Sequence, residues 1–151
     1  MGGVGAARRG RGGGGRRTRG RAPRGGRLPE TPWTRAALCS VDGDHAGAVA
    51  IYDAIDGDRG IPATFRDLAT ILAATHTLDK ADPAALTAKL QPLTADSSPW
   101  RFTALELTGL LAQRANDNAK AKTIFAKLAD DREAPQAVRA RAAEILASLR
   151  G

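Results

Sequence analysis

Histidine and cysteine, the residues that most often bind zinc or act in nucleophilic catalysis, are scarce in this chain. It has two histidines, His45 and His76, and one cysteine, Cys39. Each histidine lacks a second ligand at helical spacing, so the sequence favours a surface or helix-end role over metal binding. Cys39 cannot form an internal disulfide and has no neighbouring histidine pattern that would make it a nucleophile. We therefore predict a protein that is not an enzyme, with no catalytic residue, no metal ligand and no cofactor.

Two Asp-Gly-Asp tripeptides, at 42–44 and 56–58, have the residue types that begin a calcium-binding loop. Neither continues with the third oxygen ligand, the glycine at the sixth position and the distal glutamate that a complete loop needs. Turn and helix-capping roles therefore fit both tripeptides better. The glycines at 12–15 precede no Lys-Ser or Lys-Thr pair, which excludes a phosphate-binding loop there.

The basic charge of the chain is concentrated in its first 27 residues, which hold eleven glycines, nine arginines and no acidic residue. The whole chain has a net charge of +7, but outside this segment 14 basic residues stand against 16 acidic ones. Arg11, Arg16 and Arg17 lie in a stretch similar in composition to RGG segments, which bind RNA through phosphate attraction and arginine stacking. Such segments interleave aromatic residues, and none occurs before Trp33. Nucleic-acid binding is therefore the less favoured of two functional hypotheses.

The composition of the chain changes at about residue 33. Apart from Met1, no apolar side chain larger than that of Val4 occurs before Leu28, so we expect 1–32 to be a disordered Gly/Arg-rich tail. Residues 33–151 are rich in alanine and leucine, with charges at helical spacing and no alternation of period two. This pattern predicts one all-α domain. The apolar stretches fall short of the roughly 20 residues that span a bilayer, so no membrane span is predicted.

Apolar periodicity predicts helices that pair through polar turns at 43–44, 78–82 and 116–117. Asp44 and Asp82 are the expected N-caps of two of them. Phe65 is expected to begin the buried stripe of the helix over 62–77, and Phe102 to be a core residue of the next long helix. The expected helices cover these ranges: 33–41, 45–55, 62–77, 83–93, 99–114, 121–130 and 135–149.

Three prolines mark a repeated unit. Pro62, Pro99 and Pro135 are 37 and 36 residues apart, a period typical of helical repeat proteins. The second helix of each unit carries a small or aliphatic residue four positions before a larger one, and residues at this spacing lie on one helix face. Since two antiparallel helices cannot bury both faces of a hairpin, the pattern predicts stacked hairpins. The three residue pairs are Ala48 with Tyr52, Leu86 with Leu90 and Ala121 with Phe125.

This pattern resembles tetratricopeptide-type repeats, with Leu86 where alanine is usual and Val138 in place of an aromatic residue. A closer resemblance is to the ancillary SecYEG translocon subunit family of the YfgM type, in its alphaproteobacterial form. That resemblance covers roughly residues 36–150 and is carried by the stretches 43–55, 62–69, 99–107 and 134–142. It implies an all-α, tetratricopeptide-like helical-hairpin solenoid with a non-catalytic role in protein binding. It also implies a bacterial inner-membrane protein with one transmembrane helix, a periplasmic repeat domain, and translocon or envelope proteins as partners.

The first third of the chain departs from the family's plan. The spacing of the later units places the start of the first helix near residue 26, but glycines and prolines occupy 25–32, so only 33–41 can be helical. We expect a shortened first hairpin and no anchor, which leaves the location of this chain cytoplasmic or unknown. Our hypothesis is that 1–35 arise from a mis-set start or a shifted frame in GC-rich DNA. An incomplete terminal repeat would expose apolar surface and favour self-association.

Trp100 is the leading candidate for contact with a partner protein. It follows Pro99 at a helix start, so its ring could face a groove lined by the first helices of the hairpins, where repeat proteins bind peptides. The alternative is that Trp100 covers the preceding hairpin. Three further residues hold comparable positions on the first helices: Arg66, Thr70 and Thr103.

Overall fold

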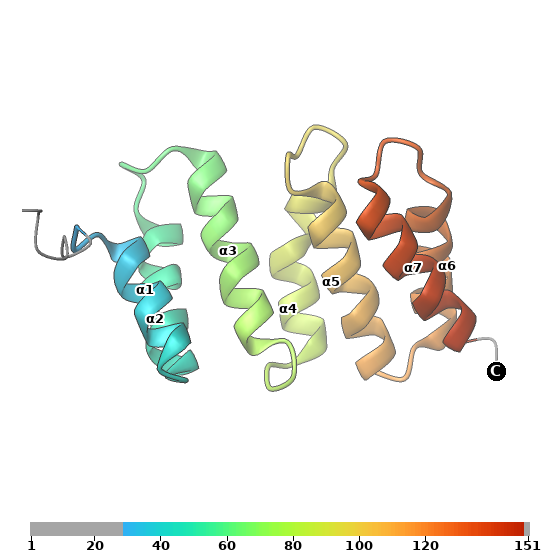
Figure 1. The fold of residues 1–151 in the computed structure, drawn as a ribbon, viewed down its shortest axis with the longest axis horizontal. Coiled ribbons are helices and arrows are strands. Elements are labelled where there is room, and N and C mark those ends of the chain that lie inside the picture. Colours follow the sequence, from blue (N-terminus) through green and yellow to red (C-terminus); the bar gives the residue numbers. More distant parts are fainter. Residues whose placement is uncertain (1–28, 150–151) are drawn as a thin grey trace, which may run out of the picture.

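The computed structural model describes residues 29–149, and this part of the chain is all helical, with no strand (Figure 1). The predicted all-α class is confirmed. The tail residues Arg11, Arg16 and Arg17 lie outside the described residues. The helices are α1 (Pro32–Val41), α2 (His45–Gly57), α3 (Ala63–Thr77), α4 (Pro83–Leu90), the 3-10 helix η1 (Gln91–Thr94), α5 (Arg101–Arg114), α6 (Asn118–Asp130) and α7 (Gln136–Ser148).

The helices stand side by side in the order of the chain (Figure 1). The hairpins α1–α2, α3–α4 and α5–α6 follow one another, and α7 packs on α6 at the end of the row. In the view of Figure 1, α1, α3, α5 and α7 form the nearer layer, with α2, α4 and α6 behind. The arrangement is helical and repeat-like. None of the helices between residues 29 and 149 combines the length and apolarity needed to cross a membrane.

The polar turns inside the hairpins lie where the sequence predicts them. Asp44, Asp82 and Asp117 are the N-caps of α2, α4 and α6, and each side chain accepts a hydrogen bond from a backbone N–H in the first turn. Gly43 and Asn116 have φ angles of 78° and 61°, a left-handed conformation that glycine and asparagine tolerate better than other residues. The first and third hairpins therefore have the same turn structure, in which a left-handed residue is followed by an aspartate N-cap.

The first helix is short, as expected. It has ten residues, whereas α3 has 15 and α5 has 14. Thr31 caps α1 by accepting the N–H of Thr34, and Pro32 occupies the first helical position. Proline fits the first turn of a helix because its missing N–H has no intrahelical acceptor there, but it disrupts a helix interior. A helix that began earlier would place Pro32 in its interior, so α1 starts at Pro32.

The hydrophobic core consists of three clusters that follow the chain. The first lies among α1, α2 and α3, the second among α3, α4, η1 and α5, and the third among α5, α6 and α7. Helices α3 and α5 each contribute to two clusters, so every hairpin packs mainly on its neighbours. All six residues of the predicted small–large pairs are buried in these clusters.

The expectation that Phe65 belongs to the core is wrong. Its side chain is 52% exposed, and the buried residues of α3 begin four positions later, at Ala69. The first turn of α3 lies beyond the N-terminal end of α1 (Figure 1). The short first helix therefore does not cover that turn. Phe102 is partly buried against the third cluster, which is consistent with its predicted place in the core.

Side chains about one period apart in sequence touch across neighbouring hairpins. The indole Nε1–H of Trp100 donates to the backbone oxygen of Thr64 at 3.0 Å, and the two residues are 36 positions apart. A separation of 36 places two residues at equivalent positions in consecutive hairpins, so such contacts are what stacking produces. The same separation joins three other pairs, namely Ser40 with His76, Asp53 with Lys89, and Leu78 with Arg114.

Gly109 allows α6 to approach α5. A Cβ atom at this position would lie 2.7 Å from Cζ of Phe125, whose side chain is fully buried. We predict that Gly109→Ala lowers the free energy of unfolding by about 1–2 kcal/mol, because overpacking costs more than the gain in helix propensity. Urea denaturation of the full chain measures this difference.

The matched control for this substitution is Gly57→Ala at the end of α2, where an added Cβ meets no atom within 4 Å. This variant should be neutral or slightly stabilising. Shortening the facing side chain with Phe125→Leu should remove most of the penalty of Gly109→Ala in the double variant. A Gly109→Ala protein as stable as the wild type would show that the close approach does not constrain the packing.

Candidate binding surface

Trp100 connects the N-terminal end of α5 to the N-terminal end of α3. It is the N-cap residue of α5, and its ring packs partly buried against the second core cluster. Its hydrogen bond to the oxygen of Thr64 ties it to the first turn of α3. This geometry fits the role of covering the preceding hairpin, and partner binding by Trp100 stays a prediction.

The other three predicted contact residues lie on α3 and α5. The Nε of Arg66 donates to the oxygen of Ile61 at 3.2 Å, and the hydroxyl of buried Thr70 donates to the oxygen of Arg66 at 3.3 Å. Thr103 is half-buried on α5. The side chains of Arg66 and Thr70 are thus each fixed by a hydrogen bond to a nearby backbone oxygen. Neither they nor Thr103 and Trp100 line the hollow beside Arg101 described next.

A hollow of about 900 Å³ lies beside the first turn of α5, between α6 and the loops that precede α5 and α7. Leu105 and Ala126, both partly exposed, give it apolar surface. Charged residues also line it, and carboxylates outnumber cations by four to two. The charged residues are Asp96, Asp130, Asp131 and Glu133, with Arg101 and Lys127.

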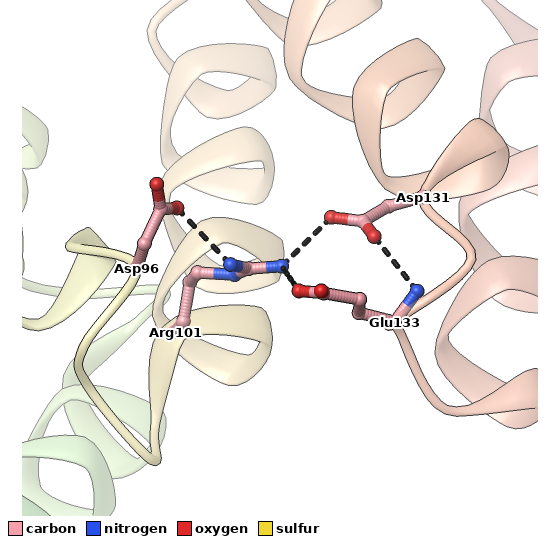
Figure 2. Close-up of polar contacts among 4 residues, drawn as sticks. All are labelled: Asp96, Arg101, Asp131 and Glu133. Atoms are coloured by element: carbon pink, nitrogen blue, oxygen red, sulfur yellow. Dashed lines mark hydrogen bonds and ion pairs between the residues drawn. The ribbon is translucent and has the colours of Figure 1, made fainter.

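Arg101 holds the rim of this hollow together (Figure 2). Its Nη1 donates to Oδ1 of Asp96 at 3.0 Å. Its Nη2 donates to Oδ2 of Asp131 at 2.9 Å and to Oε2 of Glu133 at 3.2 Å. The guanidinium also lies 4.3 Å from the ring centroid of Phe102, within cation–π range. One side chain therefore connects the loop before α5 to the loop before α7.

The three partners of Arg101 differ in exposure. The Arg101 side chain is only 11% exposed, and that of Asp131 is 31% exposed. Asp131 is fixed further because its Oδ1 accepts the backbone N–H of Glu133 at 2.9 Å. Asp96 and Glu133, in contrast, are 97% and 79% exposed. Arg101 and Asp131 form the fixed centre, while the two outer carboxylates remain accessible to solvent and to a further cation.

Sequence reasoning did not find this hollow. Arg101 is 30 and 32 positions from Asp131 and Glu133, so no local motif joins them. The acidic character of 130–133 is visible in the sequence, but its position opposite the start of α5 depends on how the hairpins stack.

No group of three or more metal-ligating side chains forms within residues 29–149. Comparisons of this protein with protein-family models, with curated proteins and with solved structures find no match.

We predict that Arg101→Gln lowers the free energy of unfolding by about 1–2 kcal/mol. The substitution leaves the half-buried Asp131 carboxylate without its charged donor and detaches the two loops from each other. Arg101→Lys should recover only part of the loss, because an ammonium cannot reproduce the planar fork of donors. Arg132→Gln, at an exposed position in the same loop, is the matched control. Equal melting temperatures for Arg101→Gln and Arg132→Gln would contradict this role for Arg101.

Proposed function

We propose that the helical domain is a tetratricopeptide-like array that binds other proteins without catalysis, and that it takes a basic, partly apolar peptide segment in the hollow beside Arg101. The observation that carries the proposal is the combination of apolar surface with an excess of carboxylates in one hollow. Binding sites of this composition use the apolar surface for affinity and the charges for orientation.

The array itself is supported by three features of the described residues. The first and third hairpins turn through a left-handed residue that is followed by an aspartate N-cap. The small–large pairs are buried at the equivalent place in each hairpin. Residues 36 positions apart touch across neighbouring hairpins. Together these features favour a solenoid, which is an architecture that presents extended surfaces to partner proteins.

The exposed carboxylates explain why the proposed partner is basic. An ionised carboxylate has about four lone-pair sites, and Asp96 and Glu133 each use one oxygen to accept from Arg101. Both can therefore accept a lysine or arginine of a partner while still paired with Arg101. Apolar side chains of the same segment would cover Leu105 and Ala126.

The identity of the partner rests on the resemblance seen in the sequence. By that resemblance we propose an ancillary role at the bacterial inner membrane, with translocon or envelope proteins as the source of the basic segment. Self-association of the array remains a second prediction of the sequence. The exposed apolar side chains of the first two hairpins that bear on it are Leu38, Val41 and Phe65.

A titration of the full chain against labelled peptides tests the proposal. A twelve-residue peptide of lysine and leucine should bind, and its counterpart of glutamate and leucine should not. The double variant Asp96→Asn/Glu133→Gln should weaken binding by about two- to thirtyfold, since each of the two exposed ion pairs contributes about 0.2–1 kcal/mol. Fluorescence anisotropy at physiological salt provides the measurement.

The matched control is Asp79→Asn/Glu144→Gln, which makes the same change of charge at exposed positions outside the hollow. Equal weakening by both double variants would show unspecific attraction and contradict the proposed site. Replacing Arg11, Arg16 and Arg17 by glutamine tests the alternative function, which is RNA binding through the basic tail. If the protein acts on RNA through its tail, those three changes reduce RNA binding and leave peptide binding unchanged.

A further inference from the structure

The two histidines of the chain meet in the structure. His45 is the first residue of α2, and His76 lies in the last turn of α3. Their Nδ1 atoms are 3.2 Å apart, and their ring centroids are 5.2 Å apart. Both histidines lie at helix ends, as the sequence predicts. They are 31 positions apart, so no helical spacing joins them, and only the packing of α3 on α2 brings them together.

The ring of His76 is held in place from two sides. The ring of buried Tyr52 lies nearly parallel to it, with an interplanar angle of 13° and a centroid distance of 5.9 Å. The hydroxyl oxygen of Ser40, on α1, lies 3.1 Å from Nε2. The orientation of His76 is thus set by all three helices of the first core cluster.

The hydrogen bonds around Ser40 assign the proton of His76. The Ser40 hydroxyl lies closer to the backbone oxygen of Ala36, at 2.9 Å, than to Nε2 of His76, at 3.1 Å. We therefore assign its proton to Ala36, which leaves the hydroxyl oxygen to accept from Nε2. In this tautomer Nδ1 of neutral His76 keeps its lone pair and faces Nδ1 of His45. A metal-ligating histidine makes the same arrangement, in which the other ring nitrogen donates to an oxygen and fixes the tautomer.

The spacing of the two Nδ1 atoms matches that of two ligands on one metal ion. Two nitrogens bound tetrahedrally at the usual zinc distance of about 2.0–2.1 Å lie about 3.3–3.4 Å apart. The observed 3.2 Å is close to this value. His45 needs only to carry its proton on Nε2 to present a second lone pair, and its exposed ring can do so at little cost.

We propose that His45 and His76 bind one Zn²⁺ ion through their Nδ1 atoms, with water filling the remaining positions. The histidines line an open hollow of about 350 Å³, which gives the ion access and leaves room for these waters. Asp53 and Lys80 line the same hollow with opposite charges. Two protein ligands make a weaker site than three or four, so this zinc links α2 to α3 without being needed for folding.

The test is calorimetric titration of the full chain with zinc chloride at pH 7.5, together with its melting temperature. We expect one zinc per chain and a melting temperature that rises with zinc concentration. His45→Gln and His76→Gln should each abolish both effects. Ser40→Ala, which keeps both ligands but removes the acceptor that fixes the tautomer of His76, should weaken zinc binding about tenfold or more.

Two control variants separate this site from other sources of zinc binding. Cys39→Ser removes the half-buried free thiol and should leave the affinity unchanged. Lys80→Gln removes a positive charge from the same hollow, so it should not weaken zinc binding. If His76→Gln fails to fold, the exposed position of His45 decides the question. Zinc binding that survives His45→Gln, or that is lost in Cys39→Ser, would overturn the proposal, as would no binding at millimolar zinc. The site lies beside the first core cluster, on α2 and α3, so its outcome does not depend on the peptide-binding hollow.

Discussion

Each hairpin of this protein depends on its neighbours for burial of its apolar side chains. The longest helix between residues 29 and 149 has 15 residues, and isolated helices of that length are marginal in water. Helices α3 and α5 bury side chains on both sides, so each joins two core clusters. Stability is therefore built from contacts between successive hairpins rather than from one central core. The recurring contacts between residues 36 positions apart result from this stacking of successive hairpins.

Stacking also creates the two sites of interest. Arg101 reaches Asp131 and Glu133 because the loop before α7 lies beside the start of α5. His76 reaches His45 and Ser40 because the end of α3 packs beside the first hairpin. Both groups combine residues that are 30–36 positions apart. Both groups of polar side chains therefore form only when the helices pack. A single helix presents only periodic apolar and charged residues.

What the sequence predicts well is local or periodic. Aspartate caps, polar turns and small–large pairs act within one or two turns, so Asp44 and the pair Ala121–Phe125 are visible without a structure. The exposure of Phe65 depends instead on how far α1 reaches along α3. The meeting of the histidines depends on helix placement to within a few ångströms. The sequence period predicts the order in which the hairpins stack. It does not predict which polar side chains come into contact between neighbouring hairpins.

Hydrogen exchange of the full chain carrying Leu90→Ala tests the dependence of each hairpin on its neighbours most directly. Leu90 is fully buried in the middle cluster, and such a truncation costs about 2–5 kcal/mol. If neighbouring hairpins stabilise one another, backbone amides in α2 and α6 should exchange faster together with those of α4. Faster exchange confined to α3 and α4, with the protection of α2 and α6 unchanged, would contradict the account.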